Sequence, residues 1–449
     1  MKRITFVIAL FLGLSVLIGG SFSSADTPGG VEFLAGAASV EITPDVGARA
    51  VPLNGYGARK GAPATGVHDP LYAKALIIES RDRATGKATR AALVTTDLCM
   101  VNLAMRKSVL GQIGNLGIGD ANFIMTASHT HSGPAALDPR FPAEMIMGKF
   151  DPILFEGINA RIAGAVREAS GKLAPAKLGV SQQEFPALVR SRRVAGYSYE
   201  TRRFAPDAGT KPVDAMMSLI RVTAADGSPI AALVVIGSHP TILGADNMKI
   251  SADWPGVMQR ELRNSIGGNV VAMFSNGAEG DQAPPSIGAG DDFTWMEWYG
   301  RQVAAAAKSL WDKASGEAGV LVTSAVFDGE LPPLHIRKFF SMPIPRTLTR
   351  SVASQAKCVA IRAGPVALIG LPGEAVSKVA LDIRGRALRM GVPNPVVVGL
   401  ANDWIGYIAD PETYREGGYE ASMTLFGENE SSVIITSAIN ALAQALSSR

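Results

Sequence analysis

The sequence predicts an α/β protein in which a mixed, largely buried sheet is flanked by helices. Two observations predict this class. Short apolar runs rich in β-branched residues end abruptly in loops of Gly, Pro and polar residues, and amphipathic segments lie between these runs. Near-continuous apolar runs of about 4–8 residues are typical of strands that are buried on both faces. Strands that alternate with helices are typical of a central sheet covered by helices.

The predicted strands recur along the chain, and each one runs into a polar residue. In order, they are RAALVTTD, NFIMTASHTH, IAALVVIGSHP, NVVAMFSNGAEGD, VALIGLPGE and PVVVGLANDWIGY. Four segments have the 3.6-residue apolar spacing of amphipathic helices; they are residues 152–173, 294–314, 374–388 and 431–446. The Gly-rich stretch GQIGNLGIGD does not follow a strand, so we interpret it as a turn rather than as a nucleotide-binding loop.

Length and composition indicate a well-packed globular chain. Of the 449 residues, 47% are apolar and 18% are charged, and the net charge is +3. This charge forms no basic stripe, so the sequence predicts no nucleic-acid partner. We expect a single domain over residues 31–449. The stretch 183–215, rich in Arg, Tyr and Pro, is expected to be a long excursion or lid.

The N-terminus predicts a signal peptide over residues 1–25. A charged start, MKR, precedes the apolar stretch ITFVIALFLGLSVLIGG, and Ser23 and Ala25 occupy the −3 and −1 positions of a cleavage site. A membrane anchor is the alternative, because the apolar stretch is borderline for spanning a bilayer. We expect an exported protein, periplasmic or extracellular, with no stable transmembrane segment after cleavage. Export would permit a disulfide between Cys99 and Cys358, and two buried thiols are the alternative.

Histidine is rare, and its placement points to a metal site. Four of the five histidines lie in loops rich in Gly or Pro: His68, His129, His131 and His239. Polar residues that end buried strands tend to converge on one sheet edge, where ligands bind. The converging set contains His129, His131, His239, Glu374 and Tyr407, with Asp97, Asp253 and Asp281 nearby in the pattern. Two or three histidines with a carboxylate and an open position form the ligand set of catalytic zinc.

The alternative for each histidine taken alone is a hydrogen-bonded structural role. In an extended segment residues i and i+2 point the same way, so HTH would present both rings to one cavity. The sequence contains no HExxH, no GxSxG and no P-loop motif. Competing chemistries therefore have little support.

An ordered set of motifs resembles a known family. NGYG, GVHDPLYAKALIIE, ALVTTDLC, TASHTHSGP, IGSHPT, SADWPG, NGAEGDQAP, LPGE and GYIADPETYREGGYE occur in the order found in neutral/alkaline ceramidases, over residues 36–425. Members of that family are zinc-dependent amidases that cleave the N-acyl bond of ceramide. By position, the resemblance implies Zn²⁺ bound by His129, His239, Glu374 and Tyr407.

The resemblance also implies roles around the metal. His131 would contact the substrate carbonyl or the attacking oxygen, Tyr407 would help to stabilise the oxyanion, and Asp281 would position a ligand or the water. Arg193 is our choice for the substrate-contacting arginine, and Arg192 fits almost as well. The hypothesis is a zinc-dependent hydrolase of the N-acyl amide bond of a small or lipid-like molecule. A metal-activated water would attack the amide carbonyl, and peripheral membrane contact would suit a lipid-like substrate.

Two departures separate the chain from the family pattern. Ceramidases carry GDVSPN with an essential serine, whereas this sequence has GDQAPP, with Ala283 in place of that serine. The chain also stops soon after the GGYE element, so we expect no C-terminal immunoglobulin-like domain. Two alternatives stay open: a catalytically weak zinc protein that binds lipids or glycans, and a metal-dependent esterase or deacetylase.

Overall fold

The computed structural model describes residues 30–140, 148–287, 290–335, 342–344 and 352–448. The predicted signal peptide, residues 1–25, lies outside this range. The largest element is an eight-stranded sheet in the order β11-β9-β8-β6-β1-β3-β4-β5. Its strands are β1 (Val31–Glu41), β3 (Tyr72–Asp82), β4 (Ala88–Thr96), β5 (Phe123–Ala127), β6 (Ala174–Glu184), β8 (Met216–Ala224), β9 (Pro229–Ile236) and β11 (Val271–Asn276).

This large sheet is mixed. The edge pairs β4–β5 and β9–β11 are parallel, whereas the neighbours between them are antiparallel. The polar loops that follow β5, β9 and β11 therefore leave the sheet at strand ends near its two edges.

A second sheet of four strands packs against the first. Its order is β13 (Val322–Glu330), β14 (Gln355–Ala363), β15 (Val366–Gly370) and β17 (Asn394–Val398), and its last pair is parallel. Three short strand pairs complete the sheets: β2 (Gly66–Val67) with β10 (Lys249–Ile250), β7 (Arg190–Ser191) with β12 (Gln282–Ala283), and β16 (Glu374–Ala375) with β18 (Tyr407–Ile408).

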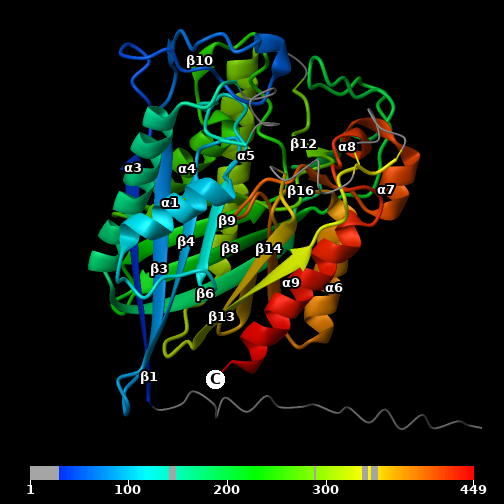
Figure 1. Cartoon of the computed structure of the whole chain (residues 1–449). Helices are drawn as coiled ribbons and strands as arrows, with labels where there is room; N and C mark the ends of the chain where they lie inside the picture. Colours follow the sequence, from blue (N-terminus) through cyan, green and yellow to red (C-terminus); the bar gives the residue numbers. More distant parts are fainter. Residues whose placement is uncertain (1–29, 141–147, 288–289, 336–341, 345–351, 449) are drawn as a thin grey trace, which may run out of the picture.

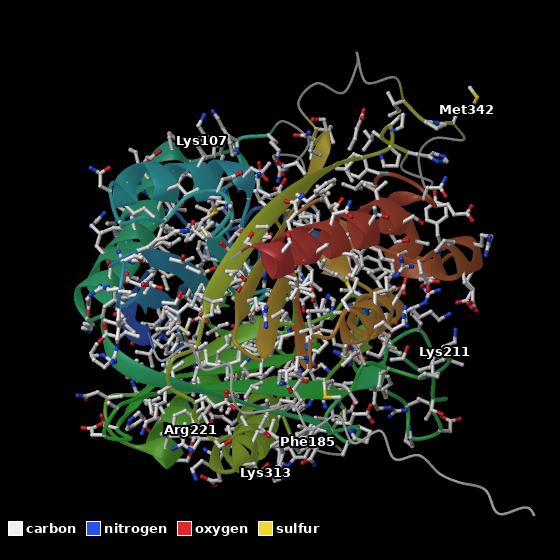
Figure 2. The ribbon with its side chains drawn as sticks, turned by 90° about the horizontal axis from the view of Figure 1, so that it is seen from below. Lys107, Phe185, Lys211, Arg221, Lys313 and Met342 are labelled. Atoms are coloured by element: carbon white, nitrogen blue, oxygen red, sulfur yellow. The ribbon has the colours of Figure 1, made fainter. Side chains whose placement is uncertain are left out.

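Helices cover the outer faces of both sheets. The helices of the described residues are α1 (Leu103–Ile113), α3 (Pro152–Gly171), α4 (Asp253–Ile266), α5 (Asp292–Lys313), α6 (Ser377–Arg389), α7 (Pro411–Glu416), α8 (Gly418–Ser422), α9 (Glu430–Ser447) and the 3-10 turn Gly57–Arg59. Helices α1 and α3 pack on the β1–β3–β4 part of the large sheet, and α4 and α5 pack on its β8–β9–β11 part. Figure 2 shows α9, in red, lying across the yellow strand β13 of the small sheet.

The alternation of side chains along the strands explains this layering. Along β9, Leu233 and Val235 belong to the core between the two sheets, whereas Ala232 and Val234 belong to the core beneath α4 and α5. Both faces of the strand are apolar because both are covered. The short strand pairs lie at the upper end of the molecule in Figure 1, where the polar loops gather.

The large sheet curls until its two edge strands meet. The Ser275 hydroxyl on β11 donates to the Thr126 hydroxyl on β5 over 3.0 Å. The loop after β17 joins the same place: Asn402 N donates to Met125 O over 2.7 Å, and Gly399 N donates to Asn276 O over 2.9 Å. The ends of β5, β11 and β17, far apart in sequence, therefore lie side by side.

The structure confirms the predicted fold class. The six predicted strands are β4, β5, β9, β11, β15 and β17, and the four predicted helices are α3, α5, α6 and α9. The Gly-rich stretch after residue 110 is the end of α1 and a turn. Cys99 and Cys358 are both buried and free. Within the described residues, no helix combines the length and apolar character needed to cross a bilayer.

Candidate metal centre

Three predicted ligands converge on one point. The Nε2 atoms of His129 and His239 each lie 3.2 Å from the same carboxylate oxygen, Oε2 of Glu374. All three side chains are buried, with 3% exposure or less. They come from the ends of β5 and β9 and from the start of β16, so the curl of the large sheet and the approach of the small one assemble the set.

The second nitrogen of each imidazole fixes the direction of the first. The Nδ1–H of His129 donates to the Cys99 carbonyl over 2.7 Å, and that of His239 donates to the Glu279 carbonyl over 2.7 Å. Each Nε2 is then left as the atom that faces Glu374. Metal-binding histidines show this arrangement, because a carbonyl on one nitrogen sets the tautomer that leaves a lone pair on the other.

This cluster requires a positive charge at its centre. Oε2 of Glu374 is buried and makes no hydrogen bond of acceptable geometry among the described residues. Two imidazole lone pairs and a carboxylate facing one another repel unless a proton or a cation lies between them. The nitrogen and oxygen donors suit Zn²⁺. The residues present therefore fit a divalent metal ion.

The electrostatics of the cluster agree with this reading. Burial, the largest single effect, lowers the pKa of His129, but Glu374 and Cys99 together outweigh it and raise the pKa of that imidazole well above its usual range. Burial would raise the pKa of Glu374, but the two imidazoles, His129 first, hold it well below its usual range. Both shifts favour a positive charge among these three side chains.

Tyr407 closes another side of the cluster. Its hydroxyl lies 3.1 Å from Nε2 of His239 and accepts a hydrogen bond from Arg192 Nη2 over 2.8 Å. It reaches this place because β16 and β18 pair in parallel with Glu374 directly opposite Tyr407. The other oxygen of Glu374, Oε1, accepts from the Trp404 indole over 2.9 Å.

The second histidine of HTH lies beside the ligand set. Nε2 of His131 is 3.2 Å from Nε2 of His129, and its Nδ1 has no partner among the described residues. Burial, followed by the neighbouring imidazoles of His129 and His239, lowers the pKa of His131 well below its usual range. A neutral His131 with a free ring nitrogen is therefore available to a bound molecule.

A strained backbone sets the directions of the two rings. His129 has φ +73°, in the left-handed region that non-glycine residues rarely adopt. The turn places His129 toward Glu374 and His131 on the neighbouring side, with the two rings almost perpendicular at 85°. The extended geometry expected for HTH is therefore wrong, although both rings do reach one site.

The arginine pair is divided between two places. Arg192 is buried, touches Tyr407 and pairs with Glu420 Oε1 over 2.9 Å. Arg193 points to α7 and α8 instead, where it pairs with Glu416 over 3.0 Å and with Glu420 over 2.7 Å. The geometry thus puts Arg192 rather than Arg193 next to the ligand set, and a substrate contact by Arg193 stays a prediction.

Asp281 does not face the ligand set directly. Its two carboxylate oxygens accept from the backbone N of Ser377 over 2.7 Å and from the Ser377 hydroxyl over 2.8 Å. Burial raises the pKa of Asp281 to about 6, and the bonds from Ser377 oppose that rise. Asp281 therefore anchors the start of α6, three residues after Glu374.

The remaining candidates support the scaffold. Asp97 accepts from Tyr72 N and from Gln259. Asp253 accepts from the backbone of Leu243 and Trp254, and the Trp254 indole donates to the His239 carbonyl over 3.2 Å. His68 packs against Phe293, with the ring centroids 4.4 Å apart, and lies outside the cluster.

Sequence reasoning missed Glu279, which lies two residues before Asp281. Its side chain is completely buried, and neither carboxylate oxygen has a partner among the described residues. Burial raises its pKa to about 8, whereas the neighbouring His129 acts in the opposite direction. The motif NGAEGD contained this residue, but a single acid inside a loop gave no signal of its own.

The fold and the cluster define an α/β protein with a buried histidine–carboxylate centre suited to a divalent metal. Residues 33–310 match the family described as neutral/alkaline non-lysosomal ceramidase, N-terminal. The chain belongs to that family, which consists of amidases.

Similar proteins agree with this assignment. Neutral ceramidase of Mycobacterium tuberculosis is 24% identical over 464 residues, which cover 84% of this chain and 71% of the relative. Neutral ceramidase A of Dictyostelium discoideum is 26% identical over 53% of this chain, which corresponds to 34% of that relative. The crystal structure of neutral ceramidase from Pseudomonas aeruginosa has the same fold, with a TM-score of 0.76 at 20% identity, over 92% of this chain and 74% of that one.

Proposed function

We propose that this protein is a zinc-dependent hydrolase of an N-acyl amide bond. One observation carries the proposal: the Nε2 atoms of His129 and His239 converge on Glu374 Oε2, and a backbone carbonyl occupies the Nδ1 of each ring. Tyr407 is the proposed fourth ligand, because its hydroxyl borders the same point. Zinc in this set would supply a Lewis acid for the amide carbonyl and would lower the pKa of a water toward about 7.

The side chains around the cluster have separate proposed tasks. His131, neutral and with an unpartnered nitrogen, would hydrogen-bond the carbonyl oxygen as negative charge develops on it. Arg192 would hold the Tyr407 oxygen in place through its 2.8 Å bond. In the overall reaction, water oxygen bonds to the acyl carbon, the C–N bond breaks and the amine leaves with a proton.

The proposed substrate is a lipid-like amide related to ceramide. Family membership and the names of the relatives support this class. Ala283 is the feature that departs from the family pattern; it is buried on β12 opposite Arg190. Loss of a serine hydroxyl there would remove one hydrogen bond to the transition state, worth about 3 kcal/mol or a hundredfold in rate. We therefore propose a substrate that differs from ceramide or is turned over slowly.

Ala283 also supports a second candidate, a zinc protein that binds lipids or glycans with weak catalysis. An esterase or deacetylase on the same centre is the third. Fluorogenic amide and ester substrates, tested with and without a chelator, separate the three. Preferential amide turnover that a chelator abolishes would support the amidase, whereas ligand binding without turnover would support the binding protein.

Export is part of the proposal. The charged start, the apolar stretch and the small residues up to Ala25 support a cleaved signal peptide and a periplasmic or extracellular location.

The experiment that tests the metal centre is the zinc content of the purified protein beside two ligand variants. We expect near-stoichiometric zinc in the wild type and its loss in His129→Ala and in His239→Ala. His68→Ala is the matched control, because His68 lies outside the cluster, and it should keep its zinc. A wild-type protein that takes up no zinc would overturn the proposed function.

A further inference from the structure

Tyrosine rings connect the candidate metal centre with the surface of the molecule. Tyr407 borders the centre, and its ring centroid lies 5.6 Å from that of Tyr419 on α8. The Tyr419 ring lies in turn 5.3 Å from the ring of Tyr199. Tyr407 is buried, whereas Tyr419 and Tyr199 are each 44% exposed. Three neighbouring rings therefore lead from the centre to solvent.

The outermost ring belongs to the long excursion that follows β7, residues 192–215. In Figure 1 this green excursion lies beside α8, which carries Tyr419. The excursion is anchored to the start of α5, where Arg203 pairs with Asp292 over 2.9 Å. An antiparallel bridge between Tyr197 and Phe204 closes the loop around Tyr199. The Tyr199 ring is therefore held in place before any ligand binds.

The polar groups beneath the two exposed rings are paired with one another. The Tyr199 hydroxyl donates to Glu420 Oε1 over 3.0 Å, and the same carboxylate accepts from Arg192 and Arg193. The Arg192 guanidinium lies 5.4 Å from the centroid of each exposed ring. The surface offered to a ligand is thus aromatic. A hydroxyl-rich ligand needs free polar partners, whereas an apolar chain needs only contact area, and this surface suits the chain.

We propose that Tyr199 and Tyr419 bind an apolar chain of the amide substrate, so that long-chain amides are preferred over short ones. This inference rests on the proposed function, since it requires that an amide is cleaved at the metal centre. With the amide bond beside Tyr407, a chain that leaves the centre toward solvent would run along the two outer rings. Tyr199 and Tyr419 therefore determine specificity and take no part in the chemistry.

The test measures kcat and KM for two pairs of fluorogenic amides. One pair differs only in its acyl group, acetyl or dodecanoyl, and the other pair carries a short or a long alkyl chain on the amine instead. We expect Tyr199→Ala to lower kcat/KM for at least one long-chain amide about tenfold, the lower end of what a changed apolar contact does to discrimination. The loss should lie in KM, and turnover of the short-chain amides should stay unchanged.

Three further variants control this result. Tyr199→Phe keeps the ring and removes its bond to Glu420, so it should keep the preference for long chains. Trp298→Ala is the matched control, because Trp298 is an aromatic residue of α5 with a similar exposure, 41%, outside the tyrosine series. Tyr419→Ala removes the neighbouring ring and should reproduce the effect of Tyr199→Ala; it decides the matter if Tyr199→Ala does not fold.

The outcomes separate the two proposals. Wild-type protein that cleaves none of the four amides would contradict the proposed function and, with it, this inference. Wild-type turnover with equal losses for short and long chains in Tyr199→Ala, or with no loss for either, would overturn this inference alone. A long-chain loss confined to one pair would support it and would show which side of the amide the rings bind.

Discussion

Gly55 leaves the space that His131 occupies beside the ligand set. It has φ +92°, and a Cβ there would lie 2.3 Å from the His131 ring. Any other residue would have to displace the ring and would adopt a backbone conformation that costs L-residues about 1–2 kcal/mol. The first glycine of the NGYG motif, Gly55, is therefore required because a larger residue would collide with the His131 ring.

We expect Gly55→Ala to lower amide turnover about a hundredfold, the effect of losing one donor to the transition state. Zinc content should stay stoichiometric, because the three atoms nearest to a Cβ at Gly55 all belong to His131, which is not a proposed ligand. Metal analysis and kinetics of the same preparation measure both. Gly57→Ala is the control, since no atom lies within 4 Å of a Cβ at that position. Loss of zinc together with activity would contradict this reading of Gly55.

Sequence reasoning succeeded best where one residue type is rare. Polar residues at strand ends led to His129, His131, His239, Glu374 and Tyr407, and the resemblance implied which of them bind the metal; the structure brings all five together. It could not separate Arg192 from Arg193, because neighbouring residues differ only in the direction that tertiary packing gives them. It missed Glu279 for a related reason. The identity of a residue does not predict whether its side chain will be buried without hydrogen-bond partners.

At the scale of elements, the start of α6 connects Asp281 with Glu374. No side chain caps this helix at Val376, and Asp281 from the loop after β11 takes that task by accepting from Ser377. The carboxylate also lies where the helix dipole favours a negative charge. Asp281 thus connects the loop after β11 of the large sheet to α6. This helix begins three residues after the proposed ligand Glu374, which itself follows β15 of the small sheet.

We expect Ser377→Ala to lower the free energy of unfolding by about 1 kcal/mol, and Asp281→Ala by about 1–3 kcal/mol, because the latter also leaves a buried N–H unsatisfied. Urea denaturation measures both values. Ser431→Ala is the control, since the hydroxyl of that buried serine near the start of α9 has no partner in the part of the chain that the structure describes. Equal stability of Asp281→Ala and the wild type would argue that Asp281 serves chemistry alone.

The elements themselves were predictable because their signals are local. Continuous apolar runs and 3.6-residue spacing located the six strands and four helices named in advance. The pairs β7–β12 and β16–β18 have two residues in each strand, too few for a periodic pattern, yet they position Ala283, Glu374 and Tyr407. The two strands of each pair are more than 30 residues apart in the chain. The packing of the two sheets brings them together, and local sequence does not predict this pairing.

On the scale of the whole molecule, the candidate metal centre joins both sheets. His129 and His239 end strands of the large sheet, whereas Glu374 follows β15 of the small sheet. A ligand that binds only the folded chain stabilises it by about 2.7 kcal/mol at a hundredfold excess over its Kd. Zinc should therefore hold the two sheets together during unfolding.

Removing zinc with a chelator should lower the Tm of the wild type and leave that of His239→Ala unchanged. Calorimetry measures the shift in Tm. Helix content and tryptophan burial, followed during the same thermal unfolding, should be lost at the same temperature. A chelator that lowers the Tm of both proteins equally would act on some other property of the chain.

The left-handed backbone of His129 has a consequence for the history of such proteins. Asn and Gly adopt φ +73° more readily than His, so replacing His129 with either would relax the chain while abolishing the centre. Selection for thermal endurance alone would then favour sequences that have discarded their chemistry. A relative with Asn or Gly at this position is expected to have kept the fold and lost the metal centre. High stability of such a relative would not indicate that it is still an enzyme.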